Sequence, residues 1–128
     1  MNKTTDIQQI LLELDFNEKW FDLGFVSSEK LYELWADFQT AEDSNKEHYR
    51  WRAFTSYLKT NNEISESNLK ELYRLGETDA DSYGMGMSMR IDILRRKDCP
   101  ADLIDKALNS DEQALVKGAK RKLGLEHN

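Results

Sequence analysis

Three stretches of the sequence align with one another without gaps, and this internal repeat constrains the fold more than any other feature. They are VSSEKLYELW (26–35), ISESNLKELY (64–73) and CPADLIDKAL (99–108), and their starts lie 38 and 35 residues apart. Each stretch is followed by a second segment with helical patterning. Two helices per repeat at this period are typical of an α-solenoid, in which neighbouring hairpins bury each other's apolar faces.

The helix-breaking residues are few, which also indicates an all-α chain. One proline and six glycines interrupt 128 residues. Apolar residues recur at the i, i+3, i+4, i+7 spacing of an amphipathic helix within 7–14 and 31–38, and no segment alternates as a strand does. The helices are predicted near residues 5–14, 17–23, 27–40, 44–59, 65–75, 82–97, 100–109 and 111–123.

The predicted helix ends carry recognisable caps. Three segments fit the capping box, in which two side chains satisfy free backbone donors at a helix start: Thr5–Gln8, Ser44–Glu47 and Ser110–Gln113. Pro100 suits a first helical position, where its missing N–H costs nothing. Three glycines follow helical patterns and are expected to end helices in the left-handed conformation: Gly24, Gly76 and Gly124.

The last repeat, residues 99–123, resembles a known class of helical repeat. A small residue and a proline open it, paired aliphatic residues and an acidic turn follow, and a V-K-x-x-A pattern lies in its second helix. The residues concerned are Pro100, Leu103, Ile104, Asp111, Val116, Lys117 and Ala119. This pattern resembles a leucine-rich-repeat-variant or HEAT-like unit, and the two earlier repeats resemble it only as degenerate copies without the proline. The resemblance implies an α-α superhelix with a binding surface and no catalytic residue.

We therefore predict one all-α domain that spans residues 1–128. It would be a short right-handed α-α superhelix of three stacked, HEAT-like hairpins, at about 26–60, 64–97 and 99–124, with an N-terminal helical cap at 1–25. A chain of this length buries roughly two-thirds of the surface that its unfolded state exposes, so it needs no disulfide or metal to form a core.

The inventory of cysteine, histidine and apolar runs limits the class of protein. Cys99 is the single cysteine, so no internal disulfide forms. A structural zinc site needs four ligands, and Cys99, His48 and His127 are the only cysteine and histidine residues in the chain. No apolar run reaches the roughly 20 residues of a membrane helix, and the N-terminus lacks the pattern of a signal peptide. We expect a cytoplasmic protein with no cofactor, no metal and no membrane contact.

The segment DADSYGMGMSMR (79–90) has the appearance of a ligand-binding loop. Its last position is Arg90, where an EF-hand loop needs a bidentate glutamate. A dinucleotide-binding loop would need a preceding strand and a third glycine, and both are missing. We interpret Asp79, Asp81 and Ser82 as a turn and helix N-cap. Gly84 and Gly86 are expected to let a neighbouring backbone approach closely.

No arrangement of residues in the sequence indicates catalysis. The chain has no nucleophile elbow and no paired-acid signature, and His48 has no nucleophile near it in the sequence. We therefore expect no enzymatic activity.

The helix that follows this segment is apolar on two sides. Met85, Met89 and Ile93 form one stripe, and a second stripe lies roughly opposite, formed by Met87, Ile91 and Leu94. Such a helix is covered on both sides in the middle of a stack. The alternative is an open methionine-rich face that binds a partner or a second copy, since methionine adapts to varied surfaces. We expect a monomer or a weak homodimer, and a homodimer would associate through this methionine stripe.

The acidic N-terminal half of the chain suggests the first functional hypothesis, that the protein is a module that binds another protein. Residues 1–64 hold twelve acidic and seven basic residues, within a chain of net charge −6. Such a module could be a stoichiometric inhibitor or an immunity protein for a basic partner. The expected contact residues are Glu29, Glu33 and Asp37, together with Tyr49, Arg50, Trp51 and Arg52. Tryptophan, tyrosine and arginine dominate interface hot spots, although this cluster could also be core with arginines stacked over it.

The second hypothesis is a nucleic-acid or phosphate binder. Between 85 and 122 the chain holds nine basic and six acidic residues, against the acidic balance of the whole. The expected phosphate-binding residues lie on the second helices of the last two hairpins: Arg90, Arg95, Arg96, Lys117, Lys120 and Arg121. The alternative is solvated charge near helix C-termini, which the helix dipole favours.

Overall fold

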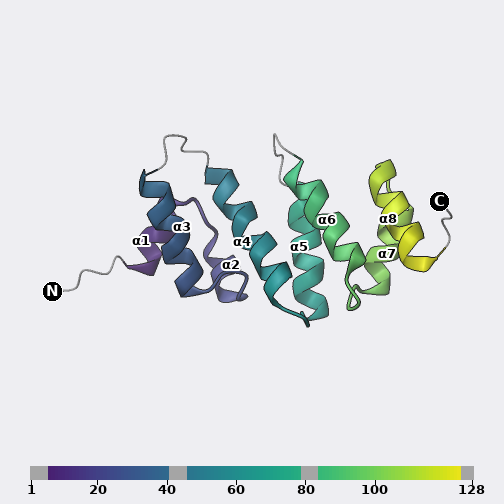
Figure 1. The fold of residues 1–128 in the computed structure, drawn as a ribbon, viewed down its shortest axis with the longest axis horizontal. Helices are drawn as coiled ribbons and strands as arrows, with labels where there is room; N and C mark the ends of the chain where they lie inside the picture. The colour runs from purple at the N-terminus through teal and green to yellow at the C-terminus, as the bar shows by residue number, and fades with distance from the viewer. Residues whose placement is uncertain (1–5, 41–45, 79–83, 125–128) are drawn as a thin grey trace. The chain divides into compact units, whose positions relative to one another are not determined.

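The computed structural model describes residues 6–40, 46–78 and 84–124, and within these ranges the chain forms eight α-helices and no β-strand (Figure 1). The all-α prediction is confirmed. No helix boundary differs from its predicted position by more than three residues. The predicted cap or turn residues Thr5, Ser44, Asp79, Asp81 and Ser82 lie outside the described residues.

The chain divides into two compact units, Met1–Thr60 and Asn61–Asn128, each of which is described by itself. The first unit contains α1 (Ile7–Glu13), α2 (Glu18–Asp22), α3 (Ser28–Thr40) and α4 (Lys46–Thr60). The second contains α5 (Glu66–Thr78), α6 (Met85–Arg95), α7 (Ala101–Leu108) and α8 (Gln113–Leu123). The stacking of three hairpins into one right-handed superhelix stays a prediction.

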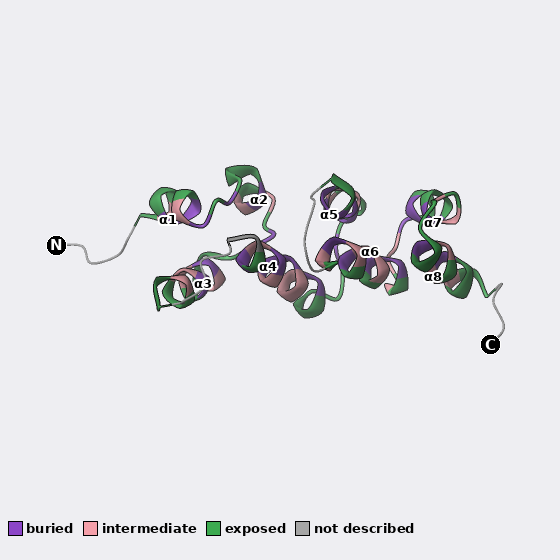
Figure 2. Ribbon diagram, turned by 90° about the horizontal axis from the view of Figure 1, so that it is seen from above, coloured by how far each residue is buried: buried purple, intermediate pink, exposed green. Residues whose placement is uncertain are grey.

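The helices of each unit lie in two layers. In the first unit α3 packs against α1 and α4, and in the second unit α6 packs against α5 and α8 while α8 also packs against α7. Seen from above, α5 and α7 lie in one row and α6 and α8 in another, with buried residues facing between the rows (Figure 2). None of the helices in the described ranges is long and apolar enough to cross a membrane.

An aromatic cluster centred on Phe54 forms the core of the first unit. The Phe54 side chain is 0% exposed. Its ring contacts those of Trp20, Trp51 and Phe25 edge-on at centroid distances of 5.3, 5.6 and 5.9 Å and that of Phe16 in a stacked arrangement at 6.4 Å. Edge-to-face pairs of this kind add stability beyond the apolar area that they bury, and the Trp20–Phe54 pair links α2 to α4.

The second unit has an aliphatic core and one close helix contact made possible by glycine. Gly76 was predicted to end a helix in the left-handed conformation, and that prediction is wrong, because Gly76 is buried inside α5. A Cβ atom at this position would lie 2.8 Å from the backbone oxygen of Gly86 on α6. Gly86 therefore meets a neighbouring backbone as expected, whereas Gly84 has open space around it and a φ of +70°.

The other caps divide into confirmed and corrected predictions. Gly24 and Gly124 do adopt left-handed conformations, with φ of +84° and +72°. Pro100 is the N-cap of α7 and not its first helical residue. Ser110 accepts a hydrogen bond from the N–H of Glu112 at 3.0 Å, so the predicted box with Gln113 does not form.

Candidate functional site

A groove of about 470 Å³ lies between α6 and α8 of the second unit, and we call it the basic groove. Its lining residues are Ile91, Leu94 and Arg95 of α6 and Ala114, Lys117, Gly118, Arg121 and Lys122 of α8. The α8 residues recur at helical i, i+3, i+4 spacing, so they share one face of that helix. The floor is apolar or small and the rim is cationic, and none of these lining residues is acidic.

Small residues on α8 set the shape of the floor. Gly118 lies close to α6, because a Cβ atom added there would lie 3.3 Å from Cδ1 of Leu94, closer than ordinary van der Waals contact. Ala114 occupies the same face one turn earlier and is exposed. Glycine at 118 lets the two helices approach, and the small side chain of Ala114 leaves that part of the floor open.

Two of the rim cations have no partner within the described part of the chain. Arg95 and Lys117 are both exposed, and neither side chain forms a hydrogen bond or ion pair there. Arg121 also lines the groove, in the last turn of α8, where the helix dipole favours a cation. The rim therefore presents positive charge that no described acidic side chain neutralises at Arg95 or Lys117.

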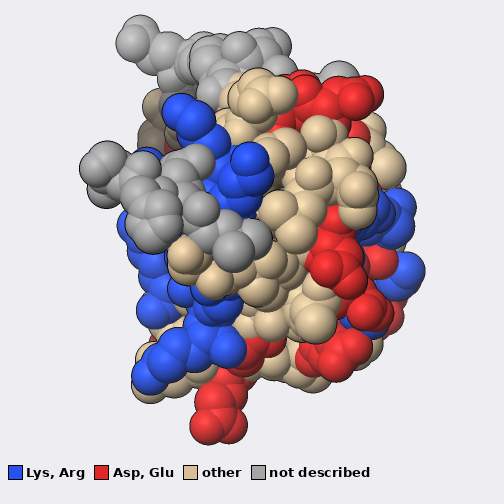
Figure 3. Space-filling model, turned by 90° about the vertical axis from the view of Figure 1, so that its right-hand side faces the viewer, with Lys and Arg blue, Asp and Glu red and all other residues tan. Residues whose placement is uncertain are grey.

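In the opposite layer of the same unit, formed by α5 and α7, the basic residues are paired with acidic ones. All three basic residues of α5 and α7 form ion pairs. Lys70 pairs with Glu66 at 2.8 Å and with Asp102 at 2.9 Å, Lys106 pairs with Glu77 at 2.9 Å, and Arg74 pairs with Glu71 at 2.5 Å. On the face drawn in Figure 3, Lys and Arg gather mainly on the left, whereas on the right they lie among most of the Asp and Glu residues.

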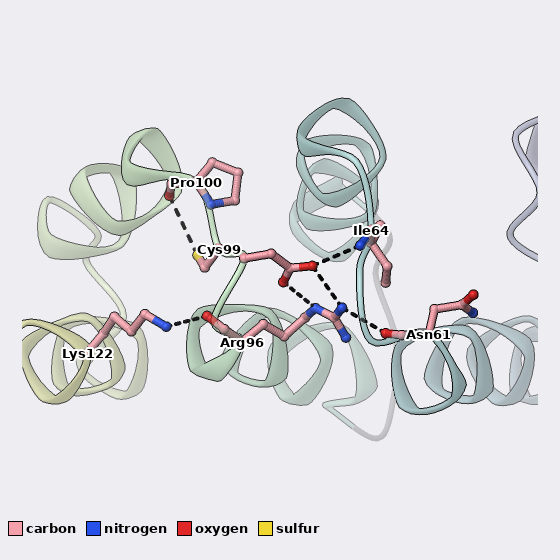
Figure 4. A network of polar contacts seen from close by, with 7 residues as sticks. Asn61, Ile64, Arg96, Cys99, Pro100 and Lys122 are labelled. Carbon is pink, nitrogen blue, oxygen red and sulfur yellow. Dashed lines mark hydrogen bonds and ion pairs between the residues drawn. The ribbon is translucent and has the colours of Figure 1, made fainter.

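A polar network at the end of α6 supports the groove (Figure 4). The Arg96 guanidinium donates to both oxygens of Asp98, at 2.7 and 3.0 Å, and to the backbone oxygen of Asn61 at 2.9 Å. Asp98 also accepts the N–H of Ile64 at 2.9 Å. The hydrogen bonds from Arg96 lower the pKa of the Asp98 carboxyl. Lys122 donates to the backbone oxygen of Arg96 and so ties α8 to the same point.

These contacts divide the six predicted phosphate-binding residues. Arg95, Lys117 and Arg121 line the basic groove. Lys120 is exposed on α8 but is not among the lining residues. Arg96 is held by the network above. Arg90 lies over the Tyr73 ring at 5.8 Å and donates to the backbone oxygen of Gly86 at 3.3 Å. Arg90 and Arg96 are half-buried and already have partners inside the second unit, and their binding of phosphate stays a prediction.

The aromatic residues of α4 belong to the core. Trp51 is 1% exposed and Tyr49 is 6% exposed. Arg50 lies over the Trp51 ring at 5.8 Å and over the Trp20 ring at 5.9 Å, and Arg52 lies over the Tyr49 ring at 5.5 Å. This is the alternative that the sequence left open, core with arginines stacked over it, and it corrects the use of the two rings as an exposed contact surface.

The acidic residues of α3 are exposed, but two of them already have partners. Asp37 forms an ion pair with Arg52 at 2.9 Å, and Glu33 forms one with Lys30 at 3.6 Å. Glu29 forms no hydrogen bond or ion pair within the described ranges. A partner that binds here competes with contacts inside the chain at two of three positions. Binding by these residues stays a prediction.

Other candidate chemistry is sparse in the described ranges. No group of three or more His, Cys, Asp or Glu residues there is placed to hold a metal ion. Cys99 is half-buried next to the α7 N-cap, and burial raises the pKa of its thiol. The core interpretation holds for part of each α6 stripe. Met89 and Ile93 of the first stripe and Leu94 of the second are buried, whereas Met85, Met87 and Ile91 are half-buried.

The sequence did not reveal the floor of the groove. Ile91 and Leu94 were assigned to a core stripe, and Ala114 and Gly118 were not singled out. One signal was present on α8, where small residues at 114 and 118 accompany bases at 117 and 121, each pair spaced by four. That spacing places a small stripe beside a basic stripe on one helix face.

The chain matches no protein-family model, no curated protein and no solved structure with which it was compared. The resemblance of residues 99–123 to HEAT-like units therefore stays a prediction, and the groove is interpreted from its own chemistry.

Proposed function

We propose that the protein is a non-catalytic binding module that takes a negatively charged partner in the basic groove. The observation that carries this proposal is the combination of an apolar floor with rim cations, of which Arg95 and Lys117 lack partners in the described part of the chain. The proposal keeps the class expected from sequence, an interaction protein without catalysis, and moves the contact surface to the second unit.

The floor and the rim would contribute differently to binding. Exposed charge pairs contribute only about 0.2–1 kcal/mol each, so the rim alone supports weak binding. Burying apolar area contributes about 25 cal/mol per Å², so the accessible apolar part of the floor, at Ile91 and Ala114, adds to the affinity, whereas Leu94 beneath them is 0% exposed. The rim then favours anionic partners and accelerates their approach, because complementary charge acts mainly on specificity and association rate.

Charge reversal at two lysines of α8 tests the proposal. The full chain is titrated into a fluorescent acidic peptide and into a fluorescent single-stranded oligonucleotide. Lys117→Glu places an acid on the groove rim, and Lys120→Glu makes the same charge change on the same helix outside the lining. We expect saturable binding of at least one probe, with a larger loss for Lys117→Glu. No binding of either probe, or equal losses in both variants, would overturn the proposal.

A second candidate function uses the acidic side of α3. Glu29, Glu33 and Asp37 are all exposed and spaced by four residues, so they share one side of the helix. We propose, as the alternative, that this side binds a basic protein, as a stoichiometric inhibitor or immunity protein would. Binding of an oligolysine peptide should weaken in Glu29→Lys and persist in Asp22→Lys, an equal charge change on α2. Equal effects in both variants would contradict it.

A further inference from the structure

We infer that the occupant of the basic groove is an acidic amphipathic helix of another protein. This inference rests on the proposed function and names its partner class. The partner would place an apolar stripe on the floor of the groove and carboxylates on both sides of that stripe against the rim.

The floor calls for apolar side chains. Leu94 and Gly118 are packed together at its base, and Ile91 and Ala114 extend it toward solvent. None of these four side chains offers a hydrogen-bond donor to an anion. A phosphate or carboxylate placed on the floor would lose its hydration without compensation, whereas a leucine or isoleucine side chain placed there gains about 1.5–3 kcal/mol.

The cations of the rim favour a partner with anionic groups on both sides of its apolar stripe. Arg95 lies on the α6 wall, and Lys117 and Arg121 lie one turn apart on the α8 wall. A partner with a single carboxylate would meet only one wall. A helix with acidic residues flanking an apolar stripe meets both, and this is the helix-in-groove mode in which anchors recur at i, i+3, i+4 and i+7.

The length of the groove also fits a short helical segment. Its α8 lining runs from Ala114 to Lys122, about 12 Å at 1.5 Å per residue, or roughly two helical turns. A contact of two turns is far smaller than a standard interface, so the complex should be transient and exchange rapidly.

Two other occupants fit the groove less well. None of the lining residues is aromatic, so the bases of a nucleic acid have no ring to stack on. A second copy of this chain could offer α3 as an acidic helix, but the apolar stripe of α3, Leu31 and Leu34, is buried in its own unit.

A pair of matched peptides tests the inference on the full-length chain. The first is a helical peptide with a leucine stripe flanked by glutamates, and the second has serine in place of every leucine at the same net charge. The third probe is a single-stranded oligonucleotide. We expect the leucine peptide to bind at least about tenfold more tightly than the serine peptide, as the burial of one leucine would provide.

Variants localise that preference to the groove. Ala114→Trp fills the floor without changing charge, and it should abolish the advantage of the leucine peptide. Lys117→Glu should weaken binding of the leucine peptide by about tenfold, and Lys120→Glu by much less. Circular dichroism confirms that each variant folds, and the comparison of the two peptides on the unaltered chain needs no variant at all.

The outcomes separate this inference from the proposed function. Equal affinity for the two peptides, or tighter binding of the oligonucleotide, would overturn the inference and leave an anion-binding groove. Self-association of the chain that Lys117→Glu disrupts would also overturn it, in favour of a second copy. Failure of all three probes to bind would overturn the inference and the proposed function together. The leucine preference, lost in Ala114→Trp, supports both.

Discussion

The α3–α4 region and the α6–α8 region contain similar residues and use them in different ways. In α4, arginines lie over buried rings, and Arg52 also neutralises Asp37. In the α6–α8 groove, Arg95 and Lys117 have neither a ring nor an acid to contact in the described part of the chain. The comparison shows that a cluster of arginine and aromatic residues in the sequence can belong to the packed core instead of a binding surface. A binding surface is better indicated by charges that the fold leaves without partners.

The largest expected effect on stability comes from removing an aromatic ring from the core of the α3–α4 region. Phe54→Ala removes the ring that four others contact, and it should lower the free energy of unfolding by about 3–5 kcal/mol. Urea denaturation followed by tryptophan fluorescence measures this directly. Ala114→Ser in the groove is the control and should change stability little. A loss below 1 kcal/mol for Phe54→Ala would mean that the rings are not the core.

A smaller loss is expected where α5 and α6 touch through backbone. Gly76→Ala places a Cβ atom 2.8 Å from a backbone oxygen, which cannot move as a side chain can. We expect a destabilisation of about 1–3 kcal/mol despite the better helix propensity of alanine. Gly118→Ala meets the end of the Leu94 side chain at 3.3 Å and should cost less, because that side chain can shift. Thermal denaturation of both variants should rank them in this order, and the reverse order would contradict the contact.

The network below the groove should show a pH-dependent contribution. Asp98→Asn loses the paired hydrogen bonds from Arg96, and after solvent screening this should cost about 1 kcal/mol at neutral pH. The pKa of Asp98 is lowered in the folded state. Its contribution is therefore fully present above the unfolded pKa of about 3.9 and is lost as pH falls through the folded value.

Denaturation of the unaltered chain and of Asp98→Asn across a pH series measures that contribution. The difference between the two should be constant from neutral pH down to about pH 5 and should shrink only at more acidic pH. A difference that stays constant at the most acidic pH would show that the Asp98 charge does not stabilise the end of α6.

The smallest effect on stability is expected at the groove rim. Lys117→Glu changes an exposed side chain with no partner within the described ranges, so the free energy of unfolding should change by less than about 0.5 kcal/mol. Arg52→Ala, which removes the ion pair with Asp37, should cost more because it also uncovers the Tyr49 ring. Denaturation curves of the two variants sharpen the comparison. A larger loss for Lys117→Glu would mean that this lysine is structural.

Much of the fold was predictable because helix formation is largely local. Apolar spacing and the left-handed glycines at 24 and 124 placed all eight helices within a few residues. Gly76 is the informative exception. Local sequence favours a glycine after a helical pattern as a cap, but contact with Gly86 makes the same residue an interior one and extends α5 to Thr78.

The site was predictable only in part, because a cation's role depends on residues far away in the sequence. The chain by itself determined that α6 and α8 are rich in bases and that α8 carries small residues beside them. Tertiary packing decided that Arg90 lies over the Tyr73 ring, that Arg96 donates to the backbone oxygen of Asn61, and that Trp51 is core. It also brought Leu94 against Gly118 to form the floor. Hydrogen bonds and ring contacts act over a few ångströms, so only the folded chain selects which bases remain available to a partner.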